Sequence, residues 1–146
     1  MELEKKNDKE WILVTKNELS TSHLSDWVVL PSCGAFVIFG GTVRNTSKDD
    51  EEVFKLNYEA YESYLGQKLD LLSESISQKY ELGRIGIHHR LGEVNLGEIS
   101  VLVAVSSPHR EESFLAAKDA IDTLKETIPI WKEECFKDRS DWVIGS

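Results

Sequence analysis

The chain has 146 residues, of which 40% are hydrophobic and 29% charged, a composition typical of a folded globular protein. Its formal net charge of −9 argues against nonspecific nucleic-acid binding, which needs a basic surface to displace counterions. It contains no apolar run of about 18 residues that would predict a membrane span, and its charged N-terminus is unlike a signal peptide. We therefore expect a soluble, cytoplasmic protein.

The domain organisation expected from the sequence is simple. Residues 1–10 are almost all charged or polar and are predicted to be a disordered leader, and the length of residues 11–146 suits one domain. Cys33 and Cys135 are far apart and without a CxxC partner, so we expect reduced thiols rather than a disulfide or a zinc site. No phosphate-loop, dinucleotide or metalloprotease motif occurs, and we expect neither a metal nor another cofactor.

The first half of the chain predicts short strands and one short helix. Residues 11–14 are expected to form a strand, and residues 22–30 a helix that Pro31 ends. The continuously apolar residues 35–39 predict a strand covered on both faces, followed by a glycine pair that permits a bulge. Residues 45–52 are polar and acidic, which predicts a solvated loop.

The second half predicts two longer helices among further strands. After a strand at 53–60, apolar residues at helical spacing predict a helix from Tyr61 to Tyr80. Residues 85–91 and 99–105 predict strands, and Ser107 and Pro108 are expected to open a second helix with Phe114 on its core face. Strands at 131–136 and 141–144 close the chain. The fold class is α+β, with two main helices packed on a mixed or antiparallel sheet.

One candidate ligand site is the segment Phe39-Gly40-Gly41-Thr42-Val43-Arg44, at the end of a predicted strand. Glycines let a ligand approach the backbone, and an arginine there can bind a phosphate or carboxylate with two hydrogen bonds. The alternative is a bulged strand end whose arginine is merely on the surface.

His109 and Arg110, at the predicted start of the second long helix, form another candidate. Helix N-termini attract anions and disfavour cations, so a histidine and an arginine there suggest an anionic ligand. The alternative is that His109 caps the helix and Arg110 pairs with Glu111 or Glu112.

Lys125 and Lys132 flank the end of the same helix. A lysine near a helix C-terminus is usually only compatible with the helix dipole and solvated. A lysine partly removed from water beside Trp131 would instead have a lowered pKa and could act as a base or nucleophile. His88 and His89 are neighbours on a predicted strand and point to opposite faces, so they do not suggest a shared metal.

Together these segments resemble the large subunit of molybdopterin synthase, the MoaE family. The resemblance runs from about Trp11 to the end of the chain and is carried by six blocks in the family's order and spacing: GAFVIFGGTVRN (34–45), YEAY (58–61), HRLGEV (89–94), VSSPHR (105–110), LKETIPIWKEE (124–134) and DWV (141–143). It implies that residues 11–146 form a single catalytic domain with the α/β-hammerhead fold of this family.

The resemblance also implies an activity and partners. Members of this family transfer sulfur from the thiocarboxylated C-terminus of a small ubiquitin-like subunit, MoaD, to cyclic pyranopterin monophosphate, forming the dithiolene of molybdopterin. Large subunits form a homodimer within a heterotetramer, and the pocket combines residues of both large subunits. By position, the resemblance assigns catalysis to Lys125 and Lys132, substrate binding to Phe39, Arg44, His109 and Arg110, and a supporting role to Glu134.

Two other functions stay open at this point. The chain could be a dimeric module that binds a ubiquitin-like tail or an anionic pterin without transforming it, although the retained lysines and arginines argue against this. It could also be a generic α+β scaffold with incidental surface cations, which would gain no stability from phosphate.

Overall fold

The computed structural model describes residues 2–144, which form three helices and two sheets. The helices are α1 (Thr21–Val28), α2 (Glu62–Lys79) and α3 (Arg110–Thr127). A five-stranded sheet has the order β1-β2-β5-β7-β3, with bounds Leu3–Lys6, Glu10–Thr15, Ile85–Arg90, Ile99–Ser107 and Ala35–Thr42. A four-stranded sheet has the order β6-β4-β8-β9, with bounds Gly92–Asn95, Lys55–Ala60, Ile130–Cys135 and Ser140–Ile144.

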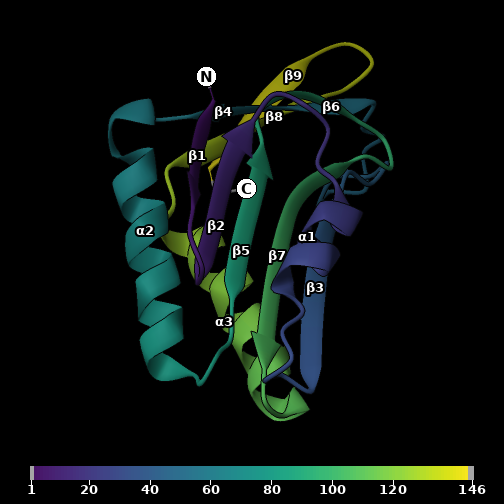
Figure 1. The fold of residues 1–146 in the computed structure, drawn as a ribbon. Coiled ribbons are helices and arrows are strands. Elements are labelled where there is room, and N and C mark those ends of the chain that lie inside the picture. Colours follow the sequence, from purple (N-terminus) through teal and green to yellow (C-terminus); the bar gives the residue numbers. More distant parts are fainter. Residues whose placement is uncertain (1, 145–146) are drawn as a thin grey trace.

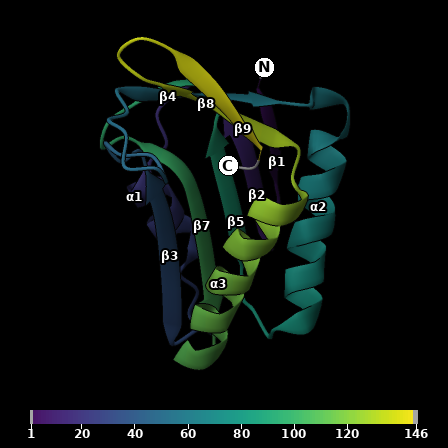
Figure 2. The ribbon, with the colours of Figure 1, turned by 180° about the vertical axis from the view of Figure 1, so that it is seen from behind.

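The five-stranded sheet lies between helices, and the four-stranded sheet crosses one end of it (Figure 1). Helices α2 and α3 contact each other and cover one face over the larger apolar core, whereas α1 covers the other face (Figure 2). All strand pairs are antiparallel except β2 with β5, which is parallel. The predicted α+β class with two main helices on a mixed sheet is confirmed, while the division into two sheets was not predicted.

The predicted disordered leader is wrong, because residues 3–6 form strand β1. This strand pairs with β2, and Leu3 packs against the main core. Lys5 forms ion pairs with Glu10 at 2.8 Å and with Asp70 of α2 at 3.2 Å. Charged side chains are common on edge strands, where they discourage pairing with other chains. The composition of this edge strand is therefore similar to that of a disordered segment, and the sequence alone did not distinguish the two. A single domain over 11–146 stays a prediction.

The expectation that both faces of β3 are covered is wrong, because its side chains are only partly buried or exposed, and β3 is also an edge strand. It pairs only with β7, and the side chain of Phe36 is 48% exposed. Helix α3 begins at Arg110 with His109 as its N-cap residue, two positions later than predicted, and Phe114 is 62% exposed rather than in the core. The core face of α3 consists instead of small and aliphatic residues, namely Ser113, Ala116, Ala117, Ala120, Ile121 and Leu124.

His88 and His89 on β5 point to opposite faces of the sheet, as predicted. His88 packs edge-on against Trp11, and His89 packs edge-on against Tyr58. Both are buried, and neither Nε2 atom has a hydrogen-bond partner within residues 2–144. Burial lowers the pKa of each histidine to about 4. Cys33 and Cys135 are free thiols.

These histidines predict a loss of stability in mild acid. Each side chain stays neutral in the fold down to a pKa of about 4, whereas in the unfolded chain it binds a proton near pH 6.5. The stability that they contribute is complete above pH 6.5 and declines as the pH falls toward 4, by about 2 kcal/mol per histidine at pH 5. Denaturant unfolding at pH 7.5 and 5.0 measures this change, and a His88→Gln, His89→Gln double variant that keeps the full pH dependence would refute the assignment.

Candidate active site

A cavity of about 400 Å³ is lined by residues of both sheets and by the last turn of α3. Five residues expected from the sequence take part in its wall: Phe39, Arg44, Lys125, Lys132 and Glu134. The remaining lining comes from the end of β3, the 46–53 segment, β4, the start of β7, Phe136 and β9. Segments more than 80 residues apart in the chain therefore meet around one space.

The end of β3 brings Arg44 to the cavity through a bulge at Gly41. The pairing of β3 with β7 shifts between Gly41 and Thr42, as the glycine pair predicted. A Cβ atom on Gly41 would lie 2.8 Å from the side chain of Val101, so only glycine fits without a shift. The Ser100 hydroxyl donates to the Gly41 carbonyl at 3.2 Å, and Val43 is buried just beyond. The backbone is thus anchored on both sides of the turn that leaves Arg44 exposed.

Lys132 and Glu134 point into the cavity because they alternate along β8. The register places Lys132 opposite Tyr58 of β4 and Glu134 opposite Leu56, and residues two apart on a strand share one face. Lys125 lies in the last turn of α3, next to the buried Leu124. Pro129 follows the helix, and the chain reverses directly into β8. The sequence from 124 to 134 therefore folds as a helix end and a strand that carry their lysines to the same place.

Lys132 has an altered protonation equilibrium. Burial lowers its pKa below the ordinary lysine value, and the neighbouring charges of Lys125, Arg44 and Lys48 lower it further, while Glu134 opposes the shift. Of the two alternatives that the sequence left open, this direction of the pKa shift fits the lysine partly removed from water. The buried Tyr58 has a raised pKa, mainly through loss of hydration, and stays a neutral hydroxyl.

Four cations at the cavity are without ion-pair partners. Among the salt bridges within residues 2–144, none includes Arg44, Lys48, Lys125 or Lys132. The same wall carries four carboxylates, of which Glu51 and Asp141 pair with Arg139, whereas Asp49 and Glu134 form no ion pair within residues 2–144. The lining therefore holds four unpaired cations and two unpaired carboxylates, in a chain of net charge −9. Like charges repel one another at short range, so an anionic ligand would stabilise the group.

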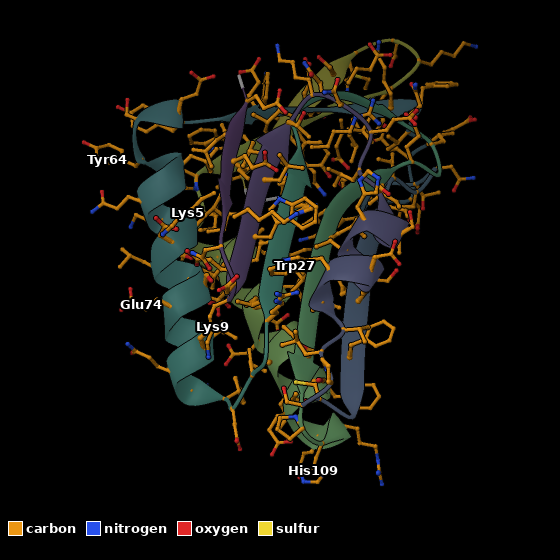
Figure 3. The ribbon with its side chains drawn as sticks, in the orientation of Figure 1. Lys5, Lys9, Trp27, Tyr64, Glu74 and His109 are labelled. Atoms are coloured by element: carbon orange, nitrogen blue, oxygen red, sulfur yellow. The ribbon has the colours of Figure 1, made fainter. Side chains whose placement is uncertain are left out.

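His109 and Arg110 do not join the cavity of their own chain. They lie at the opposite end of α3 from Lys125, and Figure 3 shows His109 at the far end of the molecule from the four-stranded sheet. Arg110 and Lys125 are fifteen positions apart on the helix, about 22 Å along its axis. The purely structural alternative for these two residues is wrong as well. The side chain of His109 does not cap the helix, and Arg110 forms no ion pair with Glu111 or Glu112.

The sequence missed one loop of the cavity wall and one buried tyrosine. The 45–52 segment is not simply a solvated loop, because Thr46, Ser47, Lys48, Asp49 and Glu51 line the cavity. Lys48 is the one basic residue in an otherwise acidic stretch, a signal that could have been read. Tyr58 was assigned no role, since only its register opposite Lys132 reveals where it lies.

Comparisons with known proteins identify the family of this chain. The family model described as "MoaE protein" matches residues 14–127. The molybdopterin synthase catalytic subunit of Taeniopygia guttata is 42% identical over 135 residues, which cover 92% of this chain and 86% of that protein. The human protein of the same name is 40% identical, over 97% of this chain and 74% of its own length.

A solved structure gives the same answer. The crystal structure of molybdopterin synthase from Staphylococcus aureus superposes with a TM-score of 0.83 at 34% identity, covering 89% of this chain and 94% of that one. The match extends over most of both chains. The chain belongs to the MoaE family.

Proposed function

We propose that the chain is the catalytic large subunit of a molybdopterin synthase. It transfers sulfur from the thiocarboxylated C-terminus of a small ubiquitin-like subunit to cyclic pyranopterin monophosphate and so forms the molybdopterin dithiolene. The observation that carries the proposal is the set of unpaired cations around one cavity, which suits a phosphorylated substrate. The relatives are named as catalytic subunits, which favours an enzyme over a module that only binds.

The cavity residues have distinct chemical roles in this proposal. In the proposed reaction the thiocarboxylate sulfur bonds to a carbon of the pterin substrate and displaces an oxygen there. Water then attacks the acyl carbonyl of the resulting thioester, which releases the tail of the small subunit as a carboxylate and leaves the sulfur on the pterin. The negative charge that develops on the carbonyl oxygen during this attack is stabilised by the ammonium of Lys125. Burial lowers the pKa of Lys132. Lys132 therefore exchanges a proton with the reacting groups more readily than an ordinary lysine. Arg44 binds the substrate phosphate, Phe39 packs against the pterin, and Glu134 moderates the charge of Lys132.

His109 and Arg110 would reach the site from a second copy of the chain. The open edge of β3 and an apolar groove between β3 and α3, with the exposed Phe114 in its wall, offer a surface for that copy. A twofold axis beside this surface and perpendicular to α3 would set the two α3 helices antiparallel, and so bring Arg110 of one copy toward Lys125 of the other. The homodimer would form the centre of a heterotetramer with two small subunits.

The protein would work in the cytoplasm without nucleic-acid or membrane partners. Among residues 2–144, no helix has the length and apolar character needed to cross a bilayer. The acidic net charge agrees with a small-molecule rather than a nucleic-acid substrate.

Reconstitution from purified components tests the proposed activity. The chain is mixed with precursor and with small subunit that ends in a thiocarboxylate, and the dithiolene product is measured. Small subunit that ends in an ordinary carboxylate is the matched control and should give no product. Precursor that stays intact after long incubation with the thiocarboxylated subunit would contradict the proposal.

Phosphate itself should stabilise the folded chain. Inorganic pyrophosphate is expected to raise the melting temperature because it binds the cations of the native cavity. At a hundredfold excess over its dissociation constant, it should increase the free energy of unfolding by about 2.7 kcal/mol. The increase should shrink in an Arg44→Gln variant. Equal shifts in both proteins would mean that Arg44 does not contact the anion.

A further inference from the structure

The segment 46–52, here called the cavity loop, is a compact loop held by its own hydrogen bonds. Thr46 and Glu52 form a β-bridge, and the Ser47 side chain at their turn is buried. The Ser47 hydroxyl accepts hydrogen bonds from the backbone N–H groups of Asp49 at 3.3 Å and Glu51 at 3.2 Å. The backbone N–H of Ser47 donates to the Glu51 carbonyl at 2.9 Å. These bonds fix the path of the loop along the cavity wall.

Lys48 is the cation that this loop carries. It lines the cavity with Arg44, Lys125 and Lys132, and its positive charge is close enough to disfavour the protonated form of Lys132. Four carboxylates follow it at positions 49–52, yet no ion pair within residues 2–144 includes Lys48. A lysine among so many acids that pairs with none of them, and lies beside three other cations, is placed for an external anion.

Arg139 ties the cavity loop to the hairpin between β8 and β9. Its guanidinium contacts Glu51 of the loop at 2.6 Å and Asp141 of β9 at 3.3 Å. Both carboxylates belong to the cavity wall. Arg139 therefore joins two walls of the cavity and neutralises two acids that would repel an anionic ligand at its edge.

We propose that Lys48 is a substrate-binding residue that contacts the phosphate of the pterin substrate, and that Arg139 is a positioning residue that holds the cavity loop in place. This proposal rests on the sulfurtransferase function above. It adds Lys48, which lies in the cavity loop, to the substrate-binding residues. The flexible ammonium of Lys48 can bind a phosphate as a point charge, while the planar guanidinium of Arg44 can donate two parallel hydrogen bonds to the same group. The contact would select phosphorylated over dephosphorylated pterins.

Steady-state kinetics with the reconstituted synthase test the role of Lys48. Lys48→Gln should raise KM for the pterin phosphate about tenfold and leave kcat within about twofold, because a charge-assisted bond present in ground and transition states is lost. Lys48→Arg should keep most of the affinity. The matched control is Lys55→Gln, a lysine of β4 that pairs with Glu93 at 3.4 Å and lies outside the cavity wall, and it should behave as the parent.

Arg139 is tested through rescue. Arg139→Gln should raise KM about threefold without changing kcat, since the loop loses its tie to β9, and Arg139→Lys should restore KM by reforming a pair with Glu51. A general structural role would instead lower the melting temperature and change kcat. If Arg139→Gln leaves KM unchanged, the positioning role is refuted.

The outcomes separate this inference from the function on which it rests. A parent enzyme that makes no product overturns both. An active parent that Lys125→Ala inactivates, together with an unchanged KM in Lys48→Gln, overturns the role of Lys48 and leaves the sulfurtransferase function intact. The expected pattern is an active parent, an inactive Lys125→Ala variant, and a Lys48→Gln variant impaired only in KM.

Discussion

Replacing Lys125 with alanine is expected to lower the rate of dithiolene formation by at least about a hundredfold, the usual cost of removing a fixed charge that stabilises a developing oxyanion. Lys125 lies in the last turn of α3 with its side chain at the cavity, while the adjacent Leu124 makes the buried contact. Alanine is a strong helix former, so the fold and binding of the small subunit should survive. Single-turnover product formation with thiocarboxylated small subunit measures the effect.

The matched control is Lys68→Ala on α2. Lys68 is an exposed helical lysine outside the cavity wall, so the same change of residue should leave the rate at the parent level. Circular dichroism and co-purification with the small subunit exclude misfolding as the cause of any loss. A Lys125→Ala variant with near-parent rates would remove this residue from the catalytic role.

Mixing two inactive variants is expected to restore activity if the site is shared between copies. When Lys125→Ala and Arg110→Ala chains assemble at random, about half of the dimers are hybrid. In each hybrid, one cavity carries both substitutions, and the other combines the intact Lys125 of one chain with the intact Arg110 of the other. The expected rate is about a quarter of the parent rate, against almost none for either variant alone.

A second mixture serves as the control for this experiment. Lys125 and Lys132 line the same cavity within one chain, so Lys125→Ala mixed with Lys132→Ala leaves every cavity damaged. Co-expression with two affinity tags isolates the hybrids in both cases. Isolated Lys125→Ala/Arg110→Ala hybrids that stay inactive would show that Arg110 does not serve the cavity of the other copy.

Local sequence patterns predicted most of the helices and strands, because the formation of a helix or strand depends largely on residues close to one another in the chain. Helical spacing of apolar residues predicted α2, and the Phe39–Arg44 segment predicted the bulge at Gly41. Errors arose where burial depends on distant segments. Phe114 fits the helical spacing but is exposed, because α3 packs through its alanines instead.

The candidate site shows the same division. The sequence identified five residues that share the cavity, since their types and spacing match a family pattern as well as phosphate chemistry. It assigned His109 and Arg110 to a pocket shared by two large subunits without deciding which copy supplies them, and the length of α3 separates them from the cavity of their own chain. It also overlooked Lys48, because a charged loop has the same composition whether it lies in water or along a cavity wall.

The sequence by itself determined the α+β class and the kinds of side chain available for chemistry, because these follow from periodicity and residue type, and its six blocks determined the family through their resemblance to known members. Only the tertiary structure decided that residues 3–6 form a strand and that Lys132 lies opposite Tyr58. It also decided that the cavity loop lies among three other cations. The physical reason is that strand register and shared cavities arise from contacts between segments far apart in the chain, and local composition carries no record of which segments meet.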